Sequence, residues 1–277
     1  MKLSTVTRAA PMSATVRRGT FVAALTITTA YNGFFDPTAD SPWLSPFLDQ
    51  TILWVCLGIG AYHLTHDRRS VRAQDLAIAV PALVCATALS PMMVWIGLAA
   101  TLCCFLLDTP SRRFRVGLLL SIAVALREPG IGLIGYTVGD HLLNADQAVM
   151  AAVSPLVFYA ADFFGATAFH DKTQIVLVWG CTSVNNVSLA LLLWSATTYT
   201  IVPRAPLRIW GFGLLLGGIV VTINVVRLAL MSIDLEHYRS IHDDPASSIF
   251  RLAVLVSIFV ITTLSTSYAL RLDIQRR

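Results

Sequence analysis

The chain has 277 residues, of which 56% are hydrophobic and only 13% are charged. Soluble domains carry about 25% charged residues, so the composition excludes an ordinary soluble protein and predicts an integral membrane protein. The apolar stretches are long and repeated, which indicates helical spans. The formal net charge of +4 does not indicate nucleic-acid binding, because the basic residues form short clusters between apolar runs, as they do in membrane loops.

Apolar runs follow one another along the whole chain. Windows of about 20 residues place them at 20–36, 48–64, 74–90, 91–107, 114–127, 148–166, 182–202, 208–231 and 248–270. The first run follows Arg17 and Arg18, and we expect it to be an uncleaved span because no small-residue cleavage site comes after it. The run 148–166 is the weakest candidate, since Pro155 interrupts it and Asp162 charges it.

Clusters of arginine decide which runs cross the membrane. They lie at Arg17/Arg18, Arg68/Arg69/Arg72, Arg112/Arg113/Arg115, Arg204/Arg208 and Arg271/Arg276/Arg277. Basic residues beside spans stay preferentially in the cytoplasm, and every cluster is cytoplasmic only if 148–166 does not cross. The sequence therefore predicts an all-α, polytopic protein of the cell membrane with about eight transmembrane helices. Both termini would be cytoplasmic, and 148–166 would form an extracytoplasmic interfacial or re-entrant helix.

Three other patterns favour ordinary explanations. Gly130–Gly135 match G-x-G-x-x-G but lack the βαβ context of a dinucleotide site, and they predict a flexible loop. Gly213 and Gly217 predict close packing of one helix against another. His63 and His66 lie at the end of an apolar run, where a solvated cytoplasmic helix end is favoured over a metal site.

Three reactive or charged side chains are expected to meet at the outer face. Cys181 opens the run 182–202, Arg227 lies inside 208–231 near its outer end, and His242 follows in the outer loop. A thiol attacks as its thiolate, which nearby positive charge favours. A histidine takes and returns the proton, and an arginine holds the oxyanion that forms. Together these groups suffice for acyl transfer through a thioester.

Neighbouring polar residues are expected to support this set. Asn224 comes three residues before Arg227 and shares its helix face. Asp243 can orient the histidine that precedes it, and Ser183 belongs to the polar stretch after the cysteine. Two alternatives stay open: the arginine snorkels to the outer surface, or His237 takes the role of the base. No motif predicts a cofactor or a resident metal.

The same residues resemble motifs of the exosortase/archaeosortase family of membrane proteins. Trp179–Ser183 resemble its cysteine motif at the start of a span, Asn224–Arg227 its N-x-x-R motif in the next, and His242–Asp243 the histidine that opens the last. We expect the whole chain, residues 1–277, to form a single membrane domain. The resemblance covers roughly residues 148–270 of it, whereas residues 1–147 match the family only as a series of hydrophobic spans. The family commonly has Cys-Ser-Gly, and here no glycine follows the cysteine.

The resemblance implies a cysteine peptidase or transpeptidase that cleaves a C-terminal sorting signal from secreted proteins and passes the protein to an acceptor. It implies Cys181 as the nucleophile, His242 as the general acid and base, and Arg227 as the partner of the oxyanion or thiolate. Secreted proteins and membrane lipid would be its partners; neither nucleic acid nor a cofactor is expected. Two other functions stay open: a non-enzymatic transporter or assembly factor for surface polysaccharide, in which Arg227 and Asn224 bind an anion, and a metal-dependent hydrolase using residues 234–244.

Overall fold

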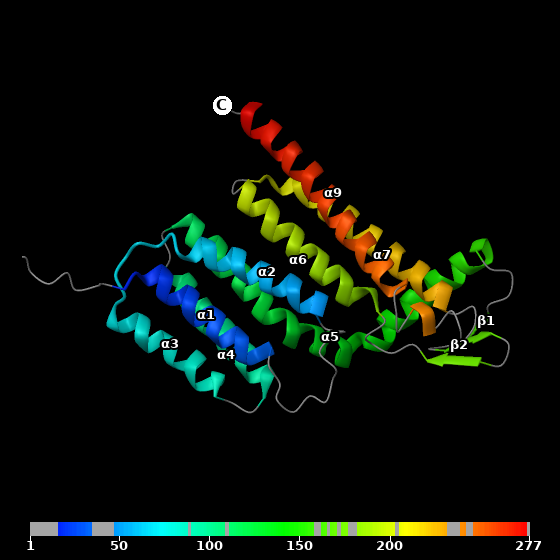
Figure 1. The fold of residues 1–277 in the computed structure, drawn as a ribbon, viewed down its shortest axis with the longest axis horizontal. Coiled ribbons are helices and arrows are strands. Elements are labelled where there is room, and N and C mark those ends of the chain that lie inside the picture. The colour runs from blue at the N-terminus through cyan, green and yellow to red at the C-terminus, as the bar shows by residue number, and fades with distance from the viewer. Residues whose placement is uncertain are drawn as a thin grey trace, which may run out of the picture.

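Most of the apolar runs fold into single helices with bounds close to those predicted. A computed structural model describes residues 16–34, 47–87, 90–108, 111–157, 162–164, 167–170, 173–176, 182–202, 205–231, 239–241 and 246–275. Its helices are α1 Arg18–Phe34, α2 Phe47–Leu64, α3 Ala73–Ala86, α4 Pro91–Leu107, α5 Arg112–Val157, α6 Ser183–Ile201, the short 3-10 helix η2 Leu207–Ile209, α7 Trp210–Met231 and α9 Ala246–Gln275. The predicted all-α class is confirmed for the main body of the molecule (Figure 1).

The predicted helix over 148–166 is wrong at its C-terminal end. Helix α5 already covers this stretch up to Val157, and a small antiparallel sheet follows, with strand order β1-β2-β3. Its strands are β1 Asp162–Phe164, β2 Thr167–His170 and β3 Thr173–Val176. These segments are rich in Phe, Thr, Ile and Val, which favour strands over helices. A hydropathy window cannot detect this difference, because it measures only apolarity.

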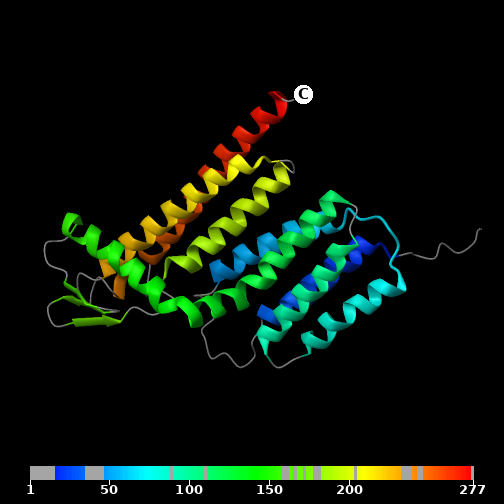
Figure 2. The ribbon, with the colours of Figure 1, turned by 180° about the vertical axis from the view of Figure 1, so that it is seen from behind.

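Helix α5 also continues where a loop was predicted. Arg112–Arg127 and Pro129–Asp146 are both helical and meet at an angle of 46°. Proline at the bend lacks an N–H, and its ring clashes with the carbonyl four residues earlier, so it kinks the helix without ending it. The flexible loop predicted for Gly130–Gly135 is therefore wrong. Helix α5 runs along the length of the molecule, and the sheet lies near its C-terminal end (Figure 2).

Two helices of the described part of the chain are long and apolar enough to cross a membrane. They are Leu207–Met231 and Ser248–Leu272, and the bent pair in α5 would make a third. Thr51–Leu64, Ala73–Ala86 and Pro91–Leu107 are apolar but shorter. By length and composition, the described part of the chain thus contains two or three helices able to span a membrane. The finer count of about eight spans stays a prediction.

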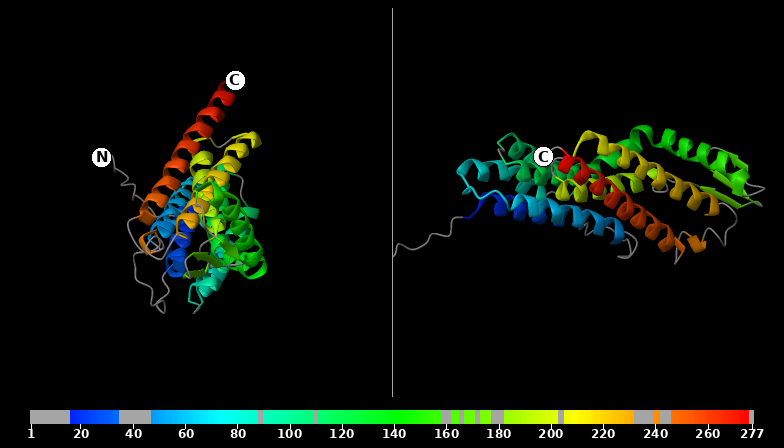
Figure 3. Two further views of the ribbon diagram at one scale, coloured as in Figure 1. Left: turned by 90° about the vertical axis from the view of Figure 1, so that its right-hand side faces the viewer. Right: turned by 90° about the horizontal axis from the view of Figure 1, so that it is seen from above.

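Helix α6 lies between two groups of helices. Helices α1 to α5 enclose one hydrophobic core, in which Leu57, Leu98 and Phe105 are fully buried. Helices α7 and α9 pack with α6 around a second core, which contains Trp194 and Leu216. Helix α6 contacts α2 and α5 on one side and α7 and α9 on the other. The last turns of α9 extend beyond the rest of the bundle (Figure 3).

Successive helices alternate in direction, so the arginine clusters gather at one end of the bundle, here called the arginine end. The start of α1 meets the end of α2 and the start of α3 there. His63 of α2 hydrogen-bonds Thr200 near the end of α6, and Phe212 of α7 contacts Tyr268 of α9. The arginines that the structure describes at this end are Arg17, Arg18, Arg68, Arg69, Arg72, Arg112, Arg113, Arg115, Arg208 and Arg271.

An ionic cluster centred on the buried Arg18 joins four segments at the arginine end. Arg18, only 1% exposed, donates from Nε to Asp75 Oδ1 at 2.7 Å. Its other nitrogens lie 3.2 Å from Asp108 Oδ2 and 3.6 Å from Asp67 Oδ2. Arg69 in turn lies 2.8 Å from Asp67 Oδ2. The cluster therefore ties the start of α1 to the loop after α2, to α3 and to the end of α4.

This cluster corrects the expectation of a solvated helix end after α2. His63 is 3% exposed and hydrogen-bonds Thr200 of α6. Asp67 is 4% exposed, because Arg18 and Arg69 surround its carboxylate. Burial alone would raise the pKa of Asp67, but the hydrogen bonds and charge of Arg69 outweigh it, so the pKa lies below its ordinary value. The same contacts raise the pKa of Arg69. Asp67 is therefore a fixed anion of the fold.

Candidate functional site

The first turns of α6 carry polar side chains at the end of the bundle opposite the arginines. Thr182 has an extended backbone, φ −68° and ψ 150°, and Ser183 begins the helix. Serine and threonine favour helix starts because they compete for the free backbone N–H groups. This sequence therefore starts the helix where the cysteine motif ends. Both residues are buried, at 1% and 3% exposure.

A carboxylate from α5 holds the start of α6. Asp146 accepts the backbone N–H of Ser183 at 2.9 Å through Oδ2 and its hydroxyl at 3.1 Å through Oδ1. The first N–H groups of a helix have no partner within the helix, and its positive dipole end favours an anion. Asp146 therefore caps α6 from another helix, and it fixes the direction of the Ser183 hydroxyl.

Asn224 of α7 completes this network. Its amide donates to Ser183 Oγ at 3.1 Å, and its carbonyl oxygen accepts from Asn186 Nδ2 at 3.4 Å. Asn224 is 3% exposed, so each of these bonds replaces water that cannot reach it. The structure thus brings together the two predicted supporting residues Ser183 and Asn224. We call Asp146, Ser183, Asn186 and Asn224 the polar network.

Arg127, at the bend of α5, contacts the next turn of α6. Its Nε donates to Ser188 Oγ at 3.2 Å, and its Nη2 donates to the side-chain oxygen of Asn185. The Ser188 hydroxyl in turn donates to the Asn185 carbonyl at 2.7 Å. This arginine and Asp146 were missed by the sequence reasoning. A signal existed for Arg127, because a charge at the edge of an apolar run usually faces a partner.

Arg227 lies near the polar network, one turn after Asn224 on α7. It is partly buried, and its Nε atom is fully buried. A snorkelling arginine would carry its whole guanidinium to the surface, so this burial favours a role inside the protein. The apolar neighbours on α7 are Val225 and Leu228, both 2% exposed.

Three of the predicted site residues lie outside the described part of the chain: Cys181, His242 and Asp243. The residues bonded to two of them are described. Thr182 follows Cys181, and its buried hydroxyl oxygen has no hydrogen-bond partner among the described residues. Ile241 precedes His242 and packs into a cluster with Val225, Leu228 and Met231 of α7.

No group of three or more metal-ligating side chains occurs among the described residues. The carboxylates and histidines between 234 and 238, and those between 242 and 244, lie outside that part of the chain. Of the cysteines that the structure describes, Cys56 is buried within α2, whereas Cys103 and Cys104 are exposed on α4. None of these three belongs to the polar network.

Comparisons with family models, with curated proteins and with solved structures found no match.

Proposed function

We propose that this chain is a membrane-embedded cysteine peptidase or transpeptidase of the exosortase type, with Cys181 as its nucleophile. Its substrate would be the C-terminal sorting signal of secreted proteins, cleaved through a thioester. One observation carries the proposal: a polar network with Ser183 and Asn224 buried at its centre joins α5, α6 and α7 directly after Thr182, which is bonded to Cys181. The motif resemblance indicates the substrate class. The polar network explains why Ser183 and Asn224 occur in the two motifs, because their side chains hydrogen-bond each other between α6 and α7.

The polar network supports the proposal because it orders the start of α6 against α7. Buried polar groups cost free energy unless they are paired, and here each bond of Ser183 and Asn224 links two helices. The start of α6 is thus held in one position relative to the helix of Arg227. Catalysis needs such fixed positions, because misplacing a reacting group by about 1 Å costs about 100-fold in rate.

The proposed reaction has two steps. The Cys181 thiolate attacks the scissile carbonyl carbon, a C–S bond forms, and Arg227 donates to the resulting oxyanion. His242 gives its proton to the leaving amine as the C–N bond breaks, which leaves a thioester. An acceptor amine or water then attacks the thioester and loses a proton to His242, and Cys181 leaves as the thiolate.

The arrangement of the helices supports the topology that this reaction needs. Helices alternate in direction through α1 to α7 and α9, so eight crossings would put both ends of the chain at the arginine end. Basic residues favour the cytoplasmic side. The polar network would then face outward, where secreted proteins emerge. The localisation that we propose is the cell membrane, with an extracytoplasmic active site.

The first test is a search for the thioester itself. Epitope-tagged protein isolated from its own cells should carry a covalent adduct that survives denaturant and is released by hydroxylamine. Cys181→Ala should abolish the adduct at unchanged abundance, while Cys103→Ala and Cys104→Ala should retain it because these thiols lie on α4. Absence of an adduct on wild type, or equal loss in all three variants, would refute the proposal.

The second test separates the enzyme from the non-enzymatic alternatives. A transporter or assembly factor that binds an anion needs the charge of Arg227, which lysine keeps, whereas an oxyanion donor needs the planar fork of arginine. Arg227→Lys should lower the rate of adduct formation about 100- to 1000-fold. A near-normal rate would make Arg227 an anchor. In parallel, His242→Ala should stop turnover and His237→Ala should not.

A further inference from the structure

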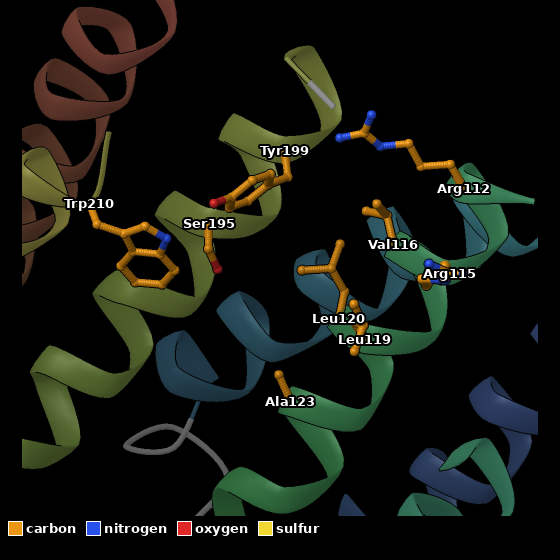
Figure 4. A pocket seen from close by; sticks show the side chains of 9 residues that line it. All are labelled: Arg112, Arg115, Val116, Leu119, Leu120, Ala123, Ser195, Tyr199 and Trp210. Atoms are coloured by element: carbon orange, nitrogen blue, oxygen red, sulfur yellow. The ribbon is translucent and has the colours of Figure 1, made fainter. Parts of the chain in front are cut away.

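A cavity of about 720 Å³ opens at the arginine end, and no residue of the polar network lines it. It lies between α5 and α6, and the start of α7 forms part of its wall. Residues that define it include Arg112, Arg115, Leu119, Ala123, Tyr199 and Trp210 (Figure 4). Neither the proposed catalytic residues nor the motif resemblance involve this cavity.

One stripe of α5 gives the cavity a charged entrance and an apolar interior. Arg112, Arg115, Leu119 and Ala123 follow each other at spacings of three and four residues, so they share one helix face. From Arg112 to Ala123 the helix rises by roughly 16 Å at 1.5 Å per residue. That length is about half of the roughly 30 Å hydrocarbon core of a bilayer, which is the depth of one leaflet.

The opposite wall carries two aromatic side chains. Tyr199 comes from α6, and Trp210 packs edge-to-face on Trp194 with ring centroids 5.3 Å apart. Rings with one apolar and one polar side sit at the level of lipid headgroups. Trp210 is 43% exposed and Leu119 is 49% exposed, so the walls continue onto the open surface of the bundle. A long chain could therefore enter from the side.

The charge at the entrance selects an anion. Figure 4 shows Arg112 extending from α5 towards α6 at the end of the cavity. Among the described residues that line the cavity none is acidic. The planar fork of arginine matches a phosphate group with two parallel hydrogen bonds. Basic pockets between helices on the cytoplasmic side of membrane proteins bind anionic lipid headgroups.

We propose that this cavity binds an anionic phospholipid of the cytoplasmic leaflet. The phosphodiester lies at Arg112 and Arg115, and one acyl chain follows Leu119 towards Ala123. A neutral, zwitterionic phospholipid fits the same apolar wall but carries a cation beside its phosphate, so the two arginines favour the anionic lipid. The site needs the chain to lie in a membrane, but it does not depend on the proposed peptidase activity.

The test measures lipid retained by the full-length protein in detergent, by native mass spectrometry. Phosphatidylglycerol should bind in preference to phosphatidylcholine with the same acyl chains. The double variant Arg112→Gln/Arg115→Gln should lower retention of phosphatidylglycerol at least tenfold. Its matched control is Arg17→Gln/Arg68→Gln, which removes two exposed arginines from the same end without touching the cavity. Equal loss in both double variants would mean nonspecific charge attraction, and the proposal would fail.

A second variant tests the apolar part of the site. Ala123→Phe fills the inner end of the cavity, so it should weaken binding of long-chain phosphatidylglycerol while the arginines at the entrance remain. Inorganic phosphate should not displace the lipid. If inorganic phosphate displaces the lipid, or if Ala123→Phe binds as well as wild type, the site recognises a phosphate group alone, and the assignment to a phospholipid is overturned.

Discussion

Replacing Arg18 by methionine should destabilise the fold more than the same replacement of any other arginine at the arginine end. The side chain is 2% exposed, and its closest partner, Asp75, is 0% exposed. Arg18→Met leaves that carboxylate buried with only the backbone N–H of Arg72, at 2.9 Å, as a described donor. Removing one partner of a buried ion pair costs about 3–5 kcal/mol.

The other two carboxylates add little to this magnitude. Asp108 is 49% exposed, so water replaces Arg18, and such a pair contributes about 0–1 kcal/mol. Asp67 keeps Arg69 at 2.8 Å. The expected loss in the free energy of unfolding is therefore set by Asp75 and stays near 3–5 kcal/mol.

The assay is equilibrium unfolding of the purified protein in mixed micelles, followed by tryptophan fluorescence. Arg17→Met is the matched control, because this neighbouring arginine is exposed and should change stability by less than about 0.5 kcal/mol. The double variant Arg18→Met/Asp75→Leu should recover most of the loss, since an apolar pair can replace a buried ion pair. Similar stabilities for the two single variants, or no recovery in the double variant, would refute the reasoning.

Three further predictions concern pH, packing and topology. The pKa of Asp67 lies below its ordinary value of 3.8, so the ionised carboxylate stabilises the fold above pH 3.8, and this stabilisation is lost as the pH falls further. The difference in the free energy of unfolding between wild type and Asp67→Asn should therefore shrink from pH 5 to pH 3. A constant difference would contradict this. Gly213→Val places a Cβ 2.9 Å from an indole ring atom and should cost about 1–3 kcal/mol in thermal unfolding, whereas Gly218→Ala, with nothing within 4 Å, should be neutral or slightly stabilising. Reporters fused after Arg208 and after Ser240 should read opposite sides of the membrane, and the same side for both would remove the proposed topology.

Helix positions could be predicted because an apolar run, and the residues that start and end a helix, are local features of the sequence. The run 91–107 coincides with α4, where Pro91 supplies a favourable first residue after Ser90. The run 182–202 differs from α6 by one residue at each end. Of the close packing predicted for Gly213 and Gly217, only the first is tight: a Cβ at Gly213 would lie 2.9 Å from the Trp194 ring, whereas one at Gly217 would make an ordinary contact with Val187 at 3.8 Å.

Helix α5 could not be predicted in full, because hydropathy measures the environment of a segment and not its backbone conformation. Residues 139–147 contain Asp140, His141 and Asn144, which end an apolar window but do not end a helix. The bend at Pro129 lies between the predicted run 114–127 and the loop predicted for Gly130–Gly135. A proline favours a helix end, but tertiary packing can carry the helix through it.

The candidate site could be predicted only in part, since its partners are distant in the sequence. Ser183 and Asn224 were named from the motif, but Asp146 lies 37 residues from Ser183 and Arg127 lies 61 residues from Ser188. A single sequence contains no information that pairs such residues. Cys181 and His242 lie outside the described residues, so their predicted roles stay predictions.

The polar character of α6 has a consequence for the order in which the protein is assembled. This helix has 19 residues and no charged side chain, yet it is not apolar enough to span a membrane by its own hydropathy. Its polar side chains depend on partners made both earlier and later in synthesis: Arg127 precedes it, whereas Asn224 and Ser265 follow. Unpaired polar groups are expensive in lipid. The proposed topology therefore predicts that stable insertion of α6 needs α7 and α9, and that the C-terminal half of the bundle enters the bilayer as a unit.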